Sequence, residues 1–104
     1  MDQHTVLRAR VKLLGINRRV LRGPDALWVY RVLTRVSPEV YGSKLAYVLV
    51  EASRSHLLLE LPEARRAVLE EAVAAAGALD ASNPFRAKML ARALEALAQE
   101  PAAP

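Results

Sequence analysis

From residue 24 onward, apolar residues recur three or four positions apart, with charged residues between them. This is the spacing of one face of an α-helix, because about 3.6 residues complete each turn. The pattern predicts helices over residues 24–36, 38–56, 62–80 and 84–99. In the final helix, the stripe expected to face the core consists of Phe85, Met89, Leu90, Ala93, Leu94 and Leu97.

Prolines mark where these four helices are predicted to begin. Proline suits the first turn because its missing N–H has no partner there and its fixed φ matches the helix. Ser37 and Asn83 each precede such a proline, so we expect their side chains to accept a capping hydrogen bond from a backbone N–H. The other two starts follow Gly23 and Leu61, which have no capping side chain.

The predicted helix over residues 38–56 differs from the others because it is apolar almost all the way round. A helix with this pattern is either central in the fold or part of an interface. The sequence leaves both open. The apolar residues of this helix are Tyr41, Leu45, Ala46, Tyr47, Val48, Leu49, Val50 and Ala52.

The first twenty residues are ambiguous, because apolar and basic residues alternate over residues 7–13 as they would in a strand. We expect a helix instead, since a lone strand would leave its backbone groups unpaired. The sequence therefore predicts an all-α fold of about five helices in antiparallel hairpins. These would form a single domain over residues 1–100, with a frayed tail at residues 101–104.

A unit of helix, short proline turn and helix occurs twice along the chain. The segment SPEVYGSKLAYVLVEAS, from Ser37, is similar to NPFRAKMLARALEALA, from Asn83, once one residue is skipped. The two units cover about residues 18–56 and 62–99, with a period of about 46 residues.

This unit resembles the repeat of the tetratricopeptide-like family, in which two antiparallel helices are joined by a turn such as Asn-Pro. The resemblance covers residues 18–99 and implies a helical hairpin array that scaffolds protein complexes, with a groove for a partner peptide or helix. A plain helical bundle fits the same residues, because the usual period of the family is about 34 residues. The matching residues are Leu45, Ala46 and Leu49 in the first unit and Leu90, Ala91 and Leu94 in the second.

Charge is distributed unevenly along the chain, whose formal net charge is +4. The excess of Lys and Arg lies in residues 1–47, whereas residues 48–104 are slightly acidic. A basic surface attracts phosphates or an acidic partner, so the alternative function is binding of a nucleic-acid backbone without sequence readout. The candidate residues for that function are Arg8, Arg10, Lys12, Arg18, Arg19, Arg22, Arg31 and Arg35.

Little in the chain points to catalysis or to a cofactor. Cysteine is absent, which excludes disulfides, thiolate nucleophiles and sulfur ligands for metals. His4 and His56 have no metal-ligand spacing and belong to no recognisable catalytic motif. The glycines stand apart, so no phosphate-binding loop is predicted. We therefore expect a protein that is not an enzyme and that needs no cofactor or metal.

The expected location is the cytoplasm, without membrane association. No secretory signal opens the chain. Apolar runs such as residues 45–50 are far shorter than the roughly 20 residues that cross a bilayer.

The leading function is a non-catalytic protein-protein interaction or scaffolding module that associates with itself or docks another protein. The helix over residues 38–56 has more apolar surface than a small monomer readily buries, and aromatic side chains concentrate in binding hot spots. For Trp28, a role as a core anchor is the competing interpretation. The residues expected to contact the partner are Trp28, Tyr30, Tyr41, Tyr47 and Val50.

Overall fold

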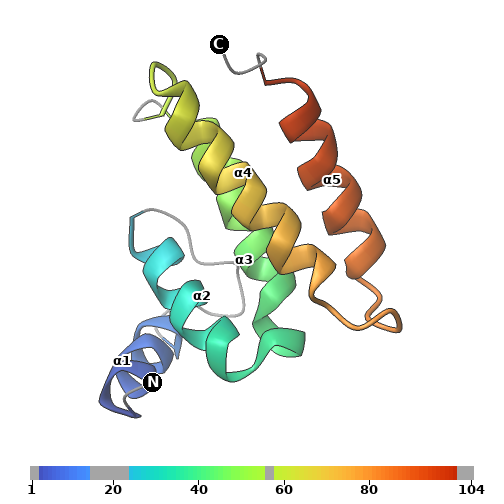
Figure 1. Cartoon of the computed structure of the whole chain (residues 1–104). Coiled ribbons are helices and arrows are strands. Elements are labelled where there is room, and N and C mark those ends of the chain that lie inside the picture. Colours follow the sequence, from blue (N-terminus) through green and yellow to red (C-terminus); the bar gives the residue numbers. More distant parts are fainter. Residues whose placement is uncertain (1–2, 15–23, 56–57, 101–104) are drawn as a thin grey trace.

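The computed structural model describes residues 3–14, 24–55 and 58–100, and these residues fold into five helices (Figure 1). Adjacent helices pack as antiparallel pairs in a compact globule. This confirms the predicted all-α fold, including a helix rather than a strand near the N-terminus. The helices are α1 (Gln3–Leu14), α2 (Pro24–Val36), α3 (Pro38–Ser53), α4 (Pro62–Gly77) and α5 (Arg86–Ala98).

The central element of the fold is α3. It packs most extensively against α4 and also contacts α2 and α5. Ala46, Leu49 and Val50 of α3 are fully buried, and burial of a Leu or Val side chain stabilises a fold by about 1.5–3 kcal/mol relative to exposure. Of the two interpretations of this apolar helix, the central one is therefore sufficient to explain its sequence.

The buried residues form one hydrophobic cluster to which all five helices contribute. In α2, Val29, Tyr30 and Leu33 have no exposed surface, because their spacing places them on one helical face. The helix α1 packs on α2 at the edge of the molecule (Figure 1) and contributes Ala9 to the cluster.

Proline begins α2, α3 and α4, as the sequence predicts. The expected side-chain cap at Ser37 is wrong. Ser37 is the N-cap residue of α3, but its side chain makes no capping hydrogen bond within the described residues. Its backbone carbonyl instead accepts hydrogen bonds from the N–H groups of Val40 and Tyr41, both at 3.1 Å.

The start of α5 also differs from the prediction, because the helix begins at Arg86 rather than at Pro84. The side-chain oxygen of Asn83 accepts a hydrogen bond from the backbone N–H of Phe85 at 2.9 Å. Such a bond closes a turn around the Asn residue. Phe85 is thus the N-cap residue of α5: its carbonyl accepts a helical hydrogen bond from the N–H of Met89 at 3.0 Å, and its side chain lies at the exposed end of the helix.

The predicted core stripe of α5 is consequently only partly right. Met89 and Ala93 are buried, as predicted, but Phe85 is 56% exposed and Leu94 is 47% exposed. An outer helix buries a narrower face than a central one, because neighbours cover it on one side only.

A partly buried ion pair joins the residues just after α5 to the start of α4. The Arg65 guanidinium donates from Nε and Nη2 to the two carboxylate oxygens of Glu100, both at 3.0 Å. The side chains are only 17% and 13% exposed. Arg65 also donates to the backbone carbonyl of Leu59, which joins the turn before α4 to the same cluster.

None of the five described helices is long and apolar enough to cross a membrane.

Candidate protein-docking groove

The turn between α4 and α5, residues 78–85, is fastened to the first turn of α3 by Glu39. The Glu39 carboxylate accepts hydrogen bonds from the backbone N–H of Asp80 (2.7 Å) and from the side-chain amide of Asn83 (2.9 Å). The Asn83 amide also donates to the backbone carbonyl of Glu39 at 3.2 Å. Hydrogen bonds to an ionised acceptor are stronger than neutral ones. This one carboxylate therefore fixes the turn against α3.

The same turn is braced internally by Asp80. Its carboxylate accepts hydrogen bonds from the hydroxyl (2.7 Å) and the backbone N–H (2.9 Å) of Ser82, and these bonds lower the pKa of Asp80. The folded pKa lies below the unfolded one, so this stabilisation is complete above the unfolded pKa. It is lost as the pH falls through the folded pKa. The brace is therefore fully formed at neutral pH.

An apolar groove opens beside this turn, between α3 and the start of α5. Its apolar lining comes from Val40 and Tyr47 of α3 and from Phe85 and Met89 at the α5 side, and it encloses about 600 Å³. Val40 and Phe85 are 58% and 56% exposed, so two large apolar side chains face water here. The other lining residues are Glu39, Ser43, Lys44, Asn83 and Pro84.

Positive charge flanks the apolar lining. The Arg92 guanidinium lies 4.9 Å from the centroid of the Tyr47 ring, and the Lys44 ammonium lies 5.8 Å from the centroid of the Tyr41 ring. Such cation–π contacts contribute about 0.5–1 kcal/mol at exposed sites. The Nε atom of Arg92 is buried and has no hydrogen-bond partner among the described residues. The groove thus combines an apolar lining with a cationic edge.

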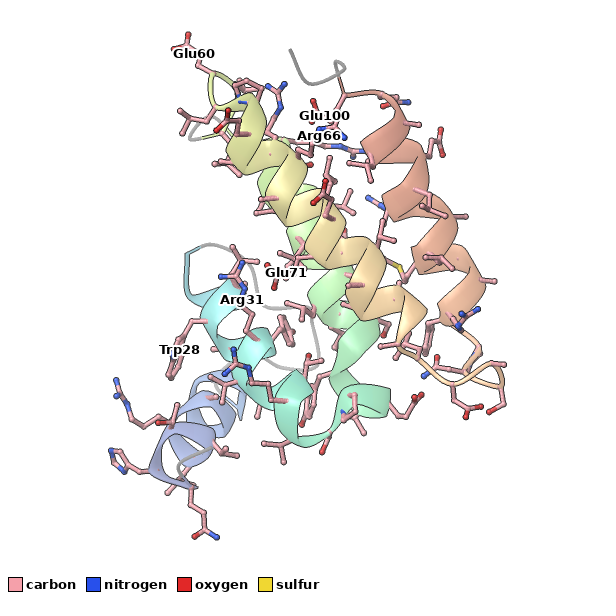
Figure 2. All side chains as sticks on the ribbon, in the orientation of Figure 1. Trp28, Arg31, Glu60, Arg66, Glu71 and Glu100 are labelled. Atoms are coloured by element: carbon pink, nitrogen blue, oxygen red, sulfur yellow. The ribbon has the colours of Figure 1, made fainter. Side chains whose placement is uncertain are left out.

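The five residues predicted to contact a partner do not come together in one place. Tyr47 lines the groove, and Tyr41 is half-buried earlier on the same helix. Trp28 lies on the side of α2 that is turned away from α4 (Figure 2), and the guanidinium of Arg8 lies 5.5 Å from its ring centroid.

Tyr30 and Val50 need a correction. Both are fully buried in the hydrophobic core, so neither can contact a partner while the fold is intact. The reason is the packing of α2 against α3, and of α3 against α4 and α5, which encloses the inner faces of these helices.

Tyr47 is the only residue of the groove lining that the sequence interpretation assigned to a partner contact, and the large apolar residues Val40, Phe85 and Met89 escaped it. The pattern assigns Phe85 and Met89 to the core stripe and gives Val40 no role. A signal for Phe85 is present in the sequence, because Asn-Pro favours a turn and thereby places the following residue at the exposed end of the helix. The approach of this turn to α3 is a tertiary contact that no local pattern contains.

The candidate nucleic-acid residues are only partly described. Arg31 donates from Nε (2.8 Å) and Nη2 (2.7 Å) to the two carboxylate oxygens of Glu71 on α4, and the side-chain pairing raises the pKa of Arg31 (Figure 2). Arg35 is exposed and lines a shallow hollow together with Arg31 and Glu71. Arg8, on α1, has its guanidinium over the ring of Trp28 on α2. The side chains that lie outside the described residues are those of Arg10, Lys12, Arg18, Arg19 and Arg22.

The Arg31–Glu71 pair changes what the α2 surface offers to a phosphate. A carboxylate already occupies the planar donor face of Arg31, which is the geometry that a phosphate would use. Of the candidate nucleic-acid residues whose side chains are described, Arg8 and Arg35 are the exposed ones, and they lie on different helices.

No group of three or more His, Cys, Asp or Glu side chains in residues 3–14, 24–55 and 58–100 could hold a metal ion. His56 lies outside these residues. Comparison of the chain with known protein families, with curated proteins and with solved structures finds no match.

Proposed function

We propose that this chain is a protein-interaction module, without catalytic activity of its own, that docks a protein partner in the groove between α3 and α5. The observation that carries the proposal is the exposure of Val40 and Phe85 beside a turn that Glu39 holds in place. Apolar side chains on a pre-ordered backbone add contact area at little entropic cost. Such residues are typical anchors of a binding hot spot.

The order of the helices supports the likeness to a tetratricopeptide-like scaffold as part of this proposal. The pairs α2–α3 and α4–α5 are two successive antiparallel hairpins. Repeat arrays bind partners on surfaces to which successive units contribute. The groove has this character, because α3 belongs to the first hairpin and α5 to the second.

The partner of the module is another protein or a second copy of this chain. Binding of a nucleic-acid backbone has less support, because Arg31 is already paired with Glu71. A mobility shift of labelled DNA and RNA at low salt tests that alternative directly.

A peptide-display selection tests the docking function without knowledge of the natural partner. A library of random peptides of about 16 residues, enough for about four helical turns, is selected against the full chain. Binders are then measured by fluorescence anisotropy against wild type, Val40→Asp and Phe85→Asp. We expect binders whose affinity falls at least tenfold, about 1.4 kcal/mol, in both variants.

Leu94→Asp is the matched control, because Leu94 is also an exposed apolar residue of α5. It follows Phe85 by nine positions, which places it on the opposite side of the helix. Binding to this variant should equal binding to wild type. A selection that yields no binder, or binders that lose affinity equally in all three variants, would refute docking in the groove.

A further inference from the structure

We propose that the occupant of the groove is an acidic amphipathic helix of a different protein, an inference that rests on the proposed docking function. It follows from three features of the groove: the charges that remain without a partner, the effect of those charges on a second copy, and the spacing of the lining residues.

Three cations next to the apolar lining have no acidic partner in the described part of the chain. Lys44 belongs to the lining, and Arg92 lies over the Tyr47 ring. Lys88 is exposed and follows Phe85 by three positions, so it shares that side of α5. None of the three forms an ion pair with a described carboxylate. Their charge is therefore available to a partner.

The acids nearest the groove are already engaged or lie outside its lining. Glu39 accepts the hydrogen bonds from Asp80 and Asn83. Glu51, further along α3, has an interaction within the protein. Glu95 lies on α5 beyond the last lining residue of that helix, Met89. Hydrogen bonds from neutral groups leave the charge of Glu39 in place, but Lys44, Lys88 and Arg92 outnumber this one acid of the lining. The net charge at the groove is therefore positive, which favours an acidic partner and disfavours a basic one.

The same charges argue against a second copy of the chain in this groove. A two-fold dimer centred here would place equivalent patches face to face. Lys44, Lys88 and Arg92 of each copy would then approach the same three cations of the other. Like charges opposed across an interface cost several kcal/mol. A symmetric groove-to-groove dimer is therefore the less favourable occupant.

The spacing of the lining favours a helix over an extended strand as the occupant. On α3, Val40, Lys44 and Tyr47 follow the i, i+4, i+7 spacing of one helical ridge. On α5, Met89 and Arg92 continue the side that begins at Phe85. Side chains of an incoming helix can interdigitate with two such ridges, as helices do when they pack in bundles. The occupant would contact both helices with an apolar stripe and flank it with Asp and Glu.

The composition and conformation of the selected peptides test this inference separately from the docking function. Peptides whose binding depends on Phe85 should be rich in Asp and Glu, with apolar residues at helical spacing. They should gain helical circular dichroism when bound. Their affinity should fall by at least tenfold between low and high salt, because rim charges are screened by salt.

Charge reversal supplies the matched comparison. We expect the double variant Lys44→Glu, Lys88→Glu to weaken the acidic peptides about tenfold or more. The double variant Arg35→Glu, Arg54→Glu makes the same change in net charge on exposed residues outside the groove, and should change the affinity less than twofold. Circular dichroism of wild type and of both double variants checks that each variant folds.

The possible results separate the two proposals. Phe85-dependent binders that are neutral or basic, that bind without helix formation, or that ignore the charge reversal would overturn this inference and leave the docking function standing. The absence of Phe85-dependent binders would overturn both. A dimer in sedimentation equilibrium that Phe85→Asp dissociates would identify a second copy as the occupant and overturn the acidic helix.

Discussion

The helices α3 and α5 carry similar sequences but are held in the fold in different ways. α3 is enclosed by α2, α4 and α5, and its Leu49 and Val50 have no exposed surface. α5 is covered on one side, where Ala93 is buried, while Phe85 and Leu94 face water. Polar contacts hold both ends of α5 in addition to this narrow apolar face.

This difference shows which parts of a small helical protein leave apolar surface exposed to a binding partner. The most apolar helix occupies the centre, because that position removes the most apolar surface from water. Several of the exposed apolar side chains instead lie at or next to the ends of helices, as Val36, Val40 and Phe85 do. Apolar content alone is therefore a poor guide to an interface.

A charge placed inside α3 should produce the largest effect. Val50→Asp puts a carboxylate at a position with no exposed surface. A buried carboxylate without a partner costs several kcal/mol, about as much as the whole free energy of unfolding of a marginal domain, about 5 kcal/mol. We expect this variant to lose its cooperative thermal transition, measured by far-ultraviolet circular dichroism.

Phe85→Asp is the corresponding change on α5. Because Phe85 is largely exposed, its free energy of unfolding should stay within about 0.5 kcal/mol of wild type. The contrast between the helices breaks down if Val50→Asp melts like wild type, or if Phe85→Asp unfolds.

The polar fastening at the end of α5 should give the next largest effect. Glu100→Ala leaves the Arg65 guanidinium, whose side chain is 17% exposed, without its carboxylate. We expect a loss of about 2 kcal/mol, between the values for exposed and fully buried pairs. Urea denaturation measures the loss, and hydrogen exchange should show faster opening of α5 than of α3.

Glu71→Ala is the control for that pair, because it removes a carboxylate with the same bidentate geometry at a more exposed site. The side chains of Arg31 and Glu71 are 42% and 36% exposed. The expected loss is below about 1 kcal/mol. Equal losses in Glu71→Ala and Glu100→Ala would mean that burial does not set the strength of these pairs.

The fastening at the other end of α5 should contribute less to stability and more to binding. Glu39→Ala removes the acceptor of the bonds from Asp80 and Asn83, which are exposed, so we expect a loss of about 1 kcal/mol. A freed turn would also loosen Phe85, and peptide affinity should fall severalfold. Glu70→Ala, an exposed acid of α4, should change neither quantity. An unchanged affinity in Glu39→Ala would show that the turn keeps its place without this carboxylate.

The sequence predicts the helices well because their signals are local. Prolines mark the first residues of α2, α3 and α4, and the apolar period identifies Met89 and Ala93 as buried. Local signals could not decide between the two interpretations of α3, a central helix or part of an interface. Both place apolar residues on every side of a helix, and only the tertiary packing distinguishes them.

The candidate groove could not be predicted, because it depends on contacts between residues far apart in the chain. Glu39 and Asn83 are 44 positions apart and are joined by a hydrogen bond, and Val40 and Phe85, the residues next to or near them in the chain, line the same groove. Tyr47 is the one predicted partner residue that lines the groove. Phe85 and Met89 reach Tyr47 in this groove because the turn before α5 packs against α3, a contact that the sequence pattern does not contain.

Substitution of two glycines by alanine should give the smallest changes in the free energy of unfolding. One glycine lies at the centre of the fold and the other at its edge. Gly42 lies in α3, where an added Cβ would come within 2.9 Å of a methyl carbon of Leu79. Gly77 ends α4, and an added Cβ there would meet no atom within 4 Å. Alanine should therefore stabilise the protein at Gly77 by about 0.4–1 kcal/mol, because it restricts the unfolded chain without a clash. At Gly42 the same gain is offset by displacement of the Leu79 side chain, so Gly42→Ala should be neutral or slightly destabilising. Urea denaturation of both variants measures the difference, and an equal gain at the two positions would show that α3 is packed less tightly than its burial indicates.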